Sequence, residues 1–244
     1  MSRFFSPPQN VRGNYIYIEG HEARHILNVM RMKEKDKVVV FDGTGKEYTG
    51  FISKIKGKSL IIEVVSTRYP KKSVQPEITL FQCMPKKEKM DYIVEKATEL
   101  GVHSIKPLIS ERTIARPSEE KNDSRISRWE KIALNAAKQC GRNDIPEIRN
   151  IEKFYNALDS VNDFDLVLMA HLSEGTIPLR EAIKDFDTGR IAVFIGPEGD
   201  FTAEEIIMAK ETNCKLISLG PRVLKSDTAG LYVITILNYE FFKQ

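Results

Sequence analysis

The segment FIGPEGDF, residues 194–201, decides how the second half of this chain is interpreted. It continues the apolar run 191–195, which is typical of a buried strand, and the run stops abruptly at GPEG, residues 196–199. The spacing from Thr202 to Glu205 is that of a capping box, which predicts that a helix begins directly afterwards. A plain strand-to-helix turn needs at most one glycine. The two glycines around a proline therefore predict a backbone that another molecule approaches closely.

Outward from this segment, strand patterns alternate with helix patterns from residue 77 to the end of the chain. The expected strands are 78–84, 104–109, 164–170, 191–195 and 215–219, and the expected helices are 86–100, 127–140, 177–183, 202–212 and 227–242. This alternation predicts an α/β domain with a mostly parallel sheet. Ligands of such sheets bind beyond the carboxyl ends of the strands. Three unusual loops fall at such ends, namely 169–171, 196–199 and 219–224.

Two of these three loops contain Gly-Pro, which favours a shared small-molecule site over two unrelated tight turns. The sequence contains neither GxGxxG nor GxxxxGK[ST], so the common dinucleotide and phosphate fingerprints are missing. That absence argues against a nucleotide-dependent oxidoreductase.

The first third of the chain has a different pattern of predicted elements. Short strand patterns recur about every ten residues, which predicts a small barrel or sandwich, and one helical pattern around residues 21–30 interrupts them. Residues 66–76 have the composition of a linker, so we place the domains at 1–72 and 73–244. Residues 1–72 contain 14 Lys and Arg against 7 Asp and Glu, whereas the remainder contains 23 against 27. A basic first domain favours nucleic acid as its partner over a merely lysine-rich surface.

Composition excludes several other classes of protein. No apolar run approaches the roughly 18 residues of a membrane span, and the first residues lack the pattern of a secretory signal. The three cysteines are far apart and fit neither a zinc site nor a disulfide framework, which indicates reduced thiols in a cytoplasm. We therefore expect a cytoplasmic protein without metal or membrane partners.

Several stretches together resemble one known family over the whole chain. The stretches are SRFF (2–5), HEARHILNVMRMK (21–33), KMDYIVEKATELGV (89–102), RWEKIALNAAKQCGRNDIPEI (128–148), GPEG (196–199) and LGPRVLKSDTAG (219–230). They are similar to the 16S rRNA (uracil-N3)-methyltransferase family of the SPOUT class. The chain departs from the family pattern at Lys225 and Asp227, where Arg and Glu are expected. Both changes keep the charge, but Lys lacks the bidentate fork of Arg.

The resemblance implies a PUA-like N-terminal β-barrel, a knotted α/β domain with helices on both faces of the sheet, and a homodimer. It further implies S-adenosylmethionine (SAM) as cofactor and, as substrate, N3 of one uridine in 16S rRNA of the small ribosomal subunit. Two other interpretations stay open. One is a SPOUT-class enzyme that acts on another RNA, at a ribose 2′-oxygen or on tRNA. The other is a non-catalytic RNA-binding factor of ribosome assembly.

The three loops contain the residues that we expect to bind the cofactor, because glycine-rich turns bring backbone amides close to an adenine and apolar side chains flank it. For Leu168 a place in the ordinary core is the simpler interpretation. The expected cofactor-binding residues are Leu168, Met169, Ala170, Ile195, Gly196, Pro197, Glu198, Gly199, Leu219, Gly220, Val223 and Leu224.

Methyl transfer to uracil N3 requires removal of a proton and stabilisation of the resulting anion. Arg222 is a candidate for pairing with that anion or with a phosphate, and Glu198 and Asp227 are candidate bases. Asp227 and Ser226 also fit the N-cap of the last helix. The expected RNA-binding residues are basic and form a footprint only collectively: Arg3, Arg24, Arg31, Lys33, Arg112, Arg116 and Arg142.

The last helix, 227–242, is apolar nearly all round, so it should be buried on more than one side. A second subunit related by a two-fold axis would cover its second face. A helix wedged between the sheet and the first domain is the alternative.

Overall fold

The computed structural model describes residues 3–69, 75–86, 89–116, 119–172 and 174–241. The chain divides into two compact units, one formed by residues 1–72 with 137–145 and the other by residues 73–136 with 146–244. The expected boundary between residues 72 and 73 lies within 70–74, outside the described residues. Residues 137–145 comprise the last turn of the long helix α3 (Asn122–Cys140) and the segment after it, and they group with the first unit.

The first unit is built on one six-stranded sheet with the strand order β1-β4-β5-β6-β3-β2. All its pairings are antiparallel except the one between β1 and β4. Its elements are β1 (Arg3–Phe5), a 3-10 turn (Pro8–Asn10), β2 (Val11–Arg12), β3 (Tyr15–Ile18), α1 (Gly20–Arg24), a π-helical turn (His25–Val29), β4 (Lys37–Phe41), β5 (Glu47–Lys56) and β6 (Ser59–Arg68).

Bulges and a glycine bend the two longest strands of this unit. The pairing of β5 with β6 shifts register after Thr49 and again after Ile52. Such bulges increase the local twist of a sheet. At Gly50 a Cβ atom would lie 2.2 Å from the carbonyl oxygen of Glu63, so only glycine fits there. The core of this unit is formed by apolar side chains of the sheet, such as Phe4, together with Ile26 of the π-helical turn.

The second unit is a parallel α/β domain, as the alternating pattern predicted. Its strands are β7 (Glu77–Cys83), β8 (Ser104–Ile109), β9 (Glu147–Ile148), β10 (Glu152–Lys153), β11 (Leu166–Ala170), β12 (Ile177–Pro178), β13 (Arg190–Ile195) and β14 (Lys215–Ser218). Its helices are α2 (Lys89–Glu99), α3 (Asn122–Cys140), α4 (Phe154–Asp159), α5 (Leu179–Ala182), α6 (Ala203–Glu211) and α7 (Ser226–Phe241), with 3-10 turns at Glu119–Lys121 and Val161–Asp163.

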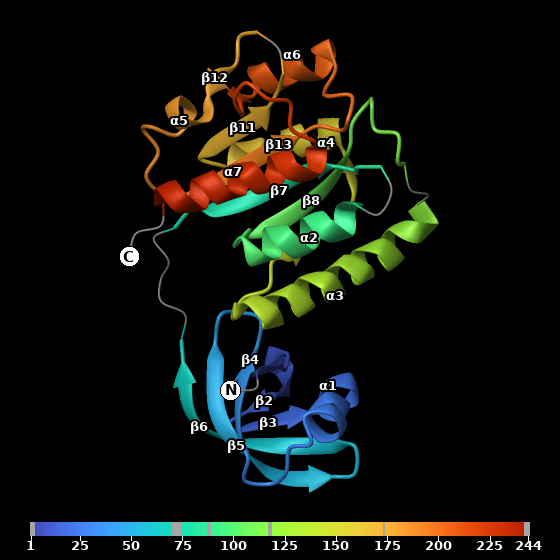
Figure 1. Ribbon diagram of the computed structural model, residues 1–244, viewed down its shortest axis with the longest axis vertical. Coiled ribbons are helices and arrows are strands. Elements are labelled where there is room, and N and C mark those ends of the chain that lie inside the picture. The colour runs from blue at the N-terminus through green and yellow to red at the C-terminus, as the bar shows by residue number, and fades with distance from the viewer. Residues whose placement is uncertain (1–2, 70–74, 87–88, 117–118, 173, 242–244) are drawn as a thin grey trace. The chain divides into compact units, whose positions relative to one another are not determined.

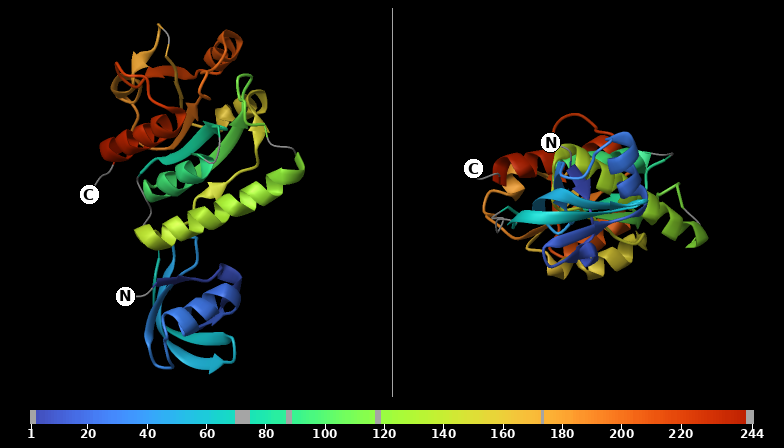
Figure 2. Two further views of the ribbon diagram at one scale, coloured as in Figure 1. Left: turned by 45° about the vertical axis from the view of Figure 1, so that its right-hand side comes forward. Right: turned by 90° about the horizontal axis from the view of Figure 1, so that it is seen from below.

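The strand order of this sheet is β10-β8-β7-β13-β11-β14-β12, with β9 beside β8, and every pairing is parallel. Helices α2 and α7 lie side by side on one face of the sheet (Figures 1 and 2). Helices α4 and α6 contribute to a core cluster on the other face, where Phe81 stacks on Phe194 with ring centroids 4.3 Å apart. Because successive strand residues face opposite sides, Leu80 and Gln82 of β7 face α7 while Phe81 faces α4.

Several boundaries differ from those expected from the sequence. Helix α3 begins at Asn122, five residues earlier than predicted, and the segment expected as one short helix from residue 177 is a two-residue strand followed by α5. The pattern between residues 147 and 160 predicted nothing, yet this stretch contains β9, β10 and α4. These elements are too short for periodicity to reveal. Phe242, the last residue of the expected C-terminal helix, lies outside the described residues.

Candidate functional site: a cavity at the carboxyl ends of three strands

Three neighbouring strands bring the three unusual loops together. Strands β13, β11 and β14 are adjacent and parallel, so their carboxyl ends meet at one edge of the sheet. A cavity of about 370 Å³ opens there, within the usual size range of small-molecule sites. It is lined by Ala170, His171, Leu172, Thr176, Ile195, Gly196, Pro197, Glu198, Asp200, Ser218, Leu219, Gly220, Pro221, Arg222, Val223, Leu224, Lys225, Ser226 and Ala229.

Most of the residues expected to bind the cofactor line this cavity. Leu168 and Met169 do not, because both side chains are fully buried in the core on either face of β11. Gly199 does not line it either, and its carbonyl oxygen accepts a hydrogen bond of 2.8 Å from Arg112. The expected residues that line the cavity are Ala170, Ile195, Gly196, Pro197, Glu198, Leu219, Gly220, Val223 and Leu224.

Apart from the candidate catalytic residue Arg222, nine lining residues were not among the residues expected at this site. His171 and Pro221 lie in the predicted loops themselves, and Ser218 lies near the end of a predicted strand. Extending the three loops by one or two residues would also have found Leu172, Asp200, Lys225 and Ser226. Thr176 and Ala229 could not be found in this way, since only the tertiary fold brings them to the cavity. The nine are His171, Leu172, Thr176, Asp200, Ser218, Pro221, Lys225, Ser226 and Ala229.

The second loop, 196–201, is held by side chains and backbone groups from three other segments. Ser226 at the start of α7 donates to the carbonyl oxygen of Gly196 at 2.7 Å. The backbone N–H of Lys86 donates to Glu198 at 3.0 Å. Arg112 donates to the Gly199 carbonyl, as described above. The loop that forms one wall of the cavity is therefore anchored along its length.

Asp200 joins this second loop to the first. It has a positive φ of 58°, a conformation that Asp tolerates better than most residues. One carboxylate oxygen accepts the N–H of Phe201 at 2.8 Å, and the other accepts the N–H of Leu172 at 3.2 Å. The second oxygen also lies 2.7 Å from Nδ1 of His171. Two walls of the cavity are thus tied together through one carboxylate.

The three candidate catalytic residues differ in what holds them. Arg222 lines the cavity with an exposed side chain, and among the described residues no hydrogen bond or ion pair engages its guanidinium. Glu198 lines it as well, with one oxygen taken by Lys86. Asp227 lies in the first turn of α7, 3.3 Å from the ammonium of Lys89, and its other oxygen is buried without a hydrogen-bond partner among the described residues.

The N-cap expected for the last helix is not formed by the side chains of Ser226 or Asp227. Helix α7 already begins at Ser226, whose hydroxyl points to the second loop instead. The carbonyl of Lys225 accepts the N–H groups of Thr228 and Ala229 at 2.9 and 2.8 Å. Lys225 also lines the cavity, so its ammonium belongs to the same site as Arg222.

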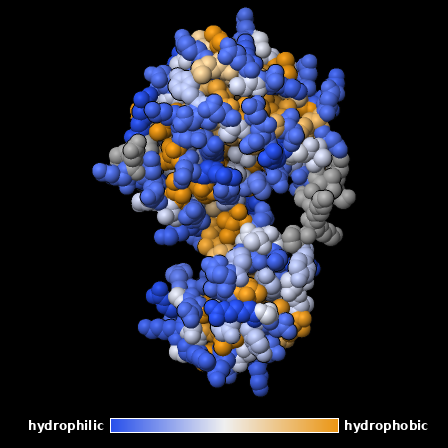
Figure 3. Space-filling model, turned by 180° about the vertical axis from the view of Figure 1, so that it is seen from behind, coloured by the Kyte–Doolittle hydropathy of each residue, from blue (hydrophilic) through white to orange (hydrophobic). Residues whose placement is uncertain are grey.

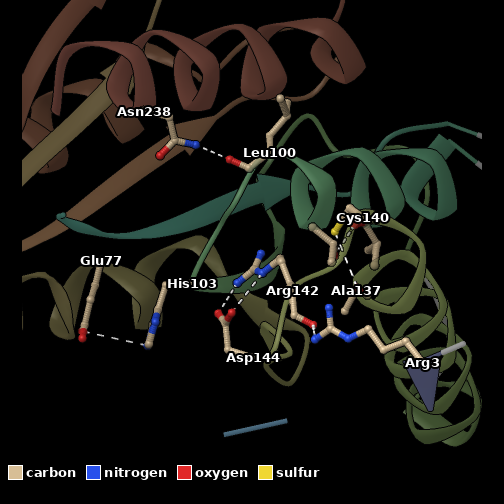
Figure 4. Close-up of polar contacts among 11 residues, drawn as sticks. Arg3, Glu77, Leu100, His103, Ala137, Cys140, Arg142, Asp144 and Asn238 are labelled. Carbon is tan, nitrogen blue, oxygen red and sulfur yellow. Dashed lines mark hydrogen bonds and ion pairs between the residues drawn. The ribbon is translucent and has the colours of Figure 1, made fainter. Parts of the chain in front are cut away.

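Two of the expected RNA-binding residues, Arg3 and Arg142, are engaged inside the first unit (Figure 4). Arg3 donates to the carbonyl oxygens of Gly141 and Arg142 and to the side chain of Asn143. Its guanidinium also lies 4.6 Å from the ring centre of Phe41, and burial lowers its pKa. Arg142 pairs with Asp144 and is only 13% exposed. Both arginines therefore hold the segment 137–145 in place.

The other expected RNA-binding residues fall into two groups. Arg112 and Arg116 bond to backbone carbonyls of the second unit, Arg112 in the second cavity loop and Arg116 in its own loop at Glu111 and Thr113. Arg24, Arg31 and Lys33 are exposed on the first unit. Arg24 also lines a shallow basic groove that sequence reasoning missed, because its lysines lie in the β5–β6 hairpin. The groove is lined by Glu19, Gly20, Arg24, Lys56, Lys58 and Ser59.

The described residues contain no group of three or more His, Cys, Asp and Glu side chains that could hold a metal ion. Within the same residues no helix is both long and apolar enough to cross a membrane. The face seen in Figure 3 is mostly hydrophilic, with hydrophobic residues in separate patches.

Comparison with known proteins matches each unit to a protein family. The RNA methyltransferase domain family matches residues 71–238, and the RNA methyltransferase PUA domain family matches residues 18–65. The fold and cavity therefore define the class as a parallel α/β RNA methyltransferase domain that follows a PUA-like domain.

Individual relatives narrow the class to a family. The chain is 31% identical over 231 residues to ribosomal RNA small subunit methyltransferase E of Bacillus subtilis, which covers 91% of this chain and 89% of the relative. It belongs to the family of the ribosomal RNA small subunit methyltransferases E.

Two similar structures hold a ligand. A Legionella pneumophila protein solved with the bound cofactor SAM superposes with a TM-score of 0.87 at 30% identity, covering 98% of each chain. The ribosomal RNA small subunit methyltransferase E of Neisseria gonorrhoeae, bound to SAM, superposes with a TM-score of 0.84 at 29% identity, covering 99% of this chain and 98% of that one. The cofactor expected from the sequence is the one that both proteins bind.

Proposed function

We propose that this protein transfers a methyl group from SAM to N3 of one uridine in 16S rRNA of the small ribosomal subunit. The observation that carries the proposal is the cavity at the ends of β11, β13 and β14. In a chain of this family, it combines apolar walls with one arginine that has no partner among the described residues. RNA methylation requires a cofactor site beside a group that can stabilise a nucleobase anion.

The residues of the cavity fit SAM. Ile195, Pro197 and Leu219 provide apolar walls, and Gly220 has a φ of 109° with open space where a Cβ would lie. Backbone groups can therefore approach an adenine closely at that turn. When bound, SAM supplies an activated methyl group, and the work left to the chain is to position the reactants and exclude water.

Arg222 has the role of stabilising the uracil anion. Loss of the N3 proton spreads negative charge over the two carbonyl oxygens of the base, and a guanidinium fork suits that charge. Glu198 and Asp227 are the candidate proton acceptors, and Asp227 lies 3.3 Å from the ammonium of Lys89. In this assignment Glu198 and Arg222 come from the same two loops as most of the cofactor-binding residues, and Asp227 comes from the first turn of α7.

The first unit contributes RNA contacts through its exposed basic side chains, which include Arg24, Arg31 and Lys33 and the groove lysines Lys56 and Lys58. Phosphate contacts of this kind position RNA without reading its sequence. In this proposal the second unit recognises the target uridine.

The test is to map modified bases in rRNA from cells with and without this protein, and to restore the gene as wild type or as Arg222→Ala. Loss of one N3-methyluridine in 16S rRNA, restored by the wild type alone, supports the proposal. In purified assays we expect Arg222→Ala to lower kcat about a hundredfold while SAM affinity stays unchanged.

Other outcomes of the same test would overturn the assignment. Loss of a ribose 2′-O-methyl group or of a tRNA modification would identify another substrate. Unchanged RNA modification together with defective small subunits would identify an assembly factor without catalytic activity.

A further inference from the structure

A fully buried amide lies directly behind the cavity. Gln82, the residue before the last of β7, has no exposed surface and faces α7. Its Nε2 donates to the hydroxyl of Ser226 at 2.9 Å and to the carbonyl of Cys83 at 3.1 Å. Its Oε1 has no hydrogen-bond partner among the described residues. Burying a polar side chain costs free energy unless hydrogen bonds within the protein replace those lost to water.

The direction of these hydrogen bonds follows from the inventory of donors. Ser226 has one hydroxyl proton, and the Gly196 carbonyl 2.7 Å away can only accept, so the hydroxyl donates there. The hydroxyl must therefore accept from Gln82, which requires the NH₂ side of the amide to face it. The chain of donors runs in one direction, from Gln82 through Ser226 to Gly196. It joins the centre of the sheet, the first turn of α7 and the wall of the cavity.

Gly230 allows this arrangement. One turn after Ser226 in α7, it has no side chain, and a Cβ there would lie 3.1 Å from Oε1 of Gln82 and 3.2 Å from Leu80. The absence of a side chain lets the helix pack closely on β7. That close packing places α7 directly against the amide, whose orientation is set by the hydrogen bonds described above.

We propose that Gln82 and Ser226 are positioning residues for the cofactor, because they fix the carbonyl of Gly196 in the cavity wall. The peptide between Gly196 and Pro197 has no N–H, so this carbonyl is its only polar group. A carbonyl held by Ser226 keeps the turn in one conformation before the cofactor binds, which lowers the entropic cost of binding. This inference rests on the proposed function, since it takes SAM as the ligand of the cavity.

Four substitutions in the full chain test this relay, by which we mean the hydrogen bonds from Gln82 through Ser226 to the Gly196 carbonyl. Ser226→Ala removes the hydroxyl, Ser226→Thr keeps it, Gln82→Leu removes the donor, and Gln82→Glu replaces the donating amide with a carboxylate. We expect SAM affinity, measured by calorimetry, to fall about tenfold in Ser226→Ala, Gln82→Leu and Gln82→Glu, which corresponds to one lost hydrogen bond. Ser226→Thr should stay within about twofold of the wild type. The KM for SAM should rise in the same three variants, while kcat at saturating SAM is unchanged.

Two matched controls separate positioning from loss of stability. Thr98→Val removes a hydroxyl that is fully buried in α2 and bonded to the carbonyl of Val94, away from the residues that line the cavity. Thr235→Ala removes an exposed hydroxyl on α7 that bonds to Leu231. Both should change thermal stability without changing SAM affinity. A fall in SAM affinity in Thr98→Val equal to that in Ser226→Ala would overturn the positioning role.

A variant that blocks the cavity separates this inference from the proposed function. Ala170→Trp places a large ring in the cavity and should abolish SAM binding. If it does so while Ser226→Ala and Gln82→Leu bind SAM as the wild type does, the relay is refuted and the site stands. If Ala170→Trp binds SAM normally, the location of the site is wrong and both proposals fall.

Discussion

Gly196 and Gly220, in two of the cavity loops, serve different purposes. Gly196 has no positive φ, but a Cβ there would lie 3.2 Å from Asp200 and from the ring of Phe201. Gly220 has a φ of 109°, a conformation that favours glycine, and no atom of the described residues lies within 4 Å of its Cβ position. The sequence suggested that both glycines make room for a ligand. At Gly196 the room is instead taken by the chain's own Phe201.

This difference leads to contrasting predictions for the two glycines. Gly196→Val should displace Phe201 and the loop, so it should weaken SAM binding at least ~tenfold and lower thermal stability, while the chain still folds. Gly220→Ala adds only backbone strain of about 1–3 kcal/mol and should affect SAM binding less. Calorimetry and thermal unfolding of both variants check this. A folded Gly196→Val protein with wild-type SAM affinity would refute the site.

The raised pKa of Tyr48, in the first unit, predicts a measurable loss of folding stability at alkaline pH. Burial is the main cause that raises its pKa to about 12, and a hydrogen bond of 3.0 Å to Asp42 adds to it. Because the folded pKa is above the unfolded value of about 10, the neutral phenol contributes stability that is complete below about pH 10. That stability is lost as the pH rises towards 12.

Ultraviolet titration of tyrosinate, compared between the wild type and Tyr48→Phe, should show one phenol missing from the late part of the curve. The fall in stability between about pH 10 and 12 should be smaller in the variant. An unchanged late phase would show that Tyr48 titrates normally.

At the scale of elements, helix α6 depends on one buried carboxylate. Glu205 is fully buried, and its two oxygens accept the N–H groups of Glu111 and Thr202, both at 2.9 Å. It therefore completes the capping box that the sequence predicted and also fixes the loop from which Arg112 reaches Gly199. One side chain joins a helix start to a distant loop.

Glu205→Ala should cost about 2–4 kcal/mol of unfolding free energy, because it removes a cap and leaves two N–H groups without a partner. Glu205→Gln keeps one accepting oxygen and should cost about half as much. Denaturant unfolding measures both values. Glu204→Ala, next to it in α6, is the matched control and should change stability little. Equal stability of Glu205→Ala and the wild type would contradict this account of α6.

For the whole molecule, the basic surface of the first unit predicts a salt dependence. Each phosphate contact adds about 0.7 to the slope of log affinity against log salt for single-stranded RNA. Replacing Arg24, Lys56 and Lys58 by Glu should weaken binding of rRNA, flatten its salt dependence and leave SAM affinity unchanged.

Deleting residues 1–72 would be a less clean experiment, because residues 137–145 group with that unit and would lose their contacts with Arg3 and Gly43. The triple charge reversal in the full chain avoids this problem. Full methylation of ribosomal substrate by that variant would refute a role of this surface in RNA binding.

The homodimer remains a prediction that rests on the apolar pattern of the final helix and on the family resemblance. Val233, Ile234 and Leu237 of α7 are buried, whereas Tyr232 is 43% and Tyr239 83% exposed. We expect the exposed face to contact a second subunit. Sedimentation at micromolar concentration should therefore give a dimer that Tyr239→Glu weakens.

Ile207→Glu is the matched control for the dimer, since it replaces another exposed apolar residue on α6 and should leave the dimer intact. A wild-type monomer with full activity would contradict the proposal. The knotted path implied by the resemblance likewise stays a prediction.

The sequence by itself determined the α/β alternation, the basic first domain and the three loops of the cavity. These features depend on local periodicity and turn chemistry, which neighbouring residues encode directly. It also predicted the capping box at Thr202, because that motif closes within one turn of helix.

Only the tertiary structure decided which of these residues act together. The order β13-β11-β14 brings the three loops to one edge of the sheet, and the burial of Leu168 and Met169 depends on which faces of β11 are covered. The relay from Gln82 to Ser226 spans 144 residues, and the contact from Arg3 to Arg142 spans 139. Contacts over such separations leave no periodic trace, because their geometry is set by the packing of whole elements and not by the residues between them.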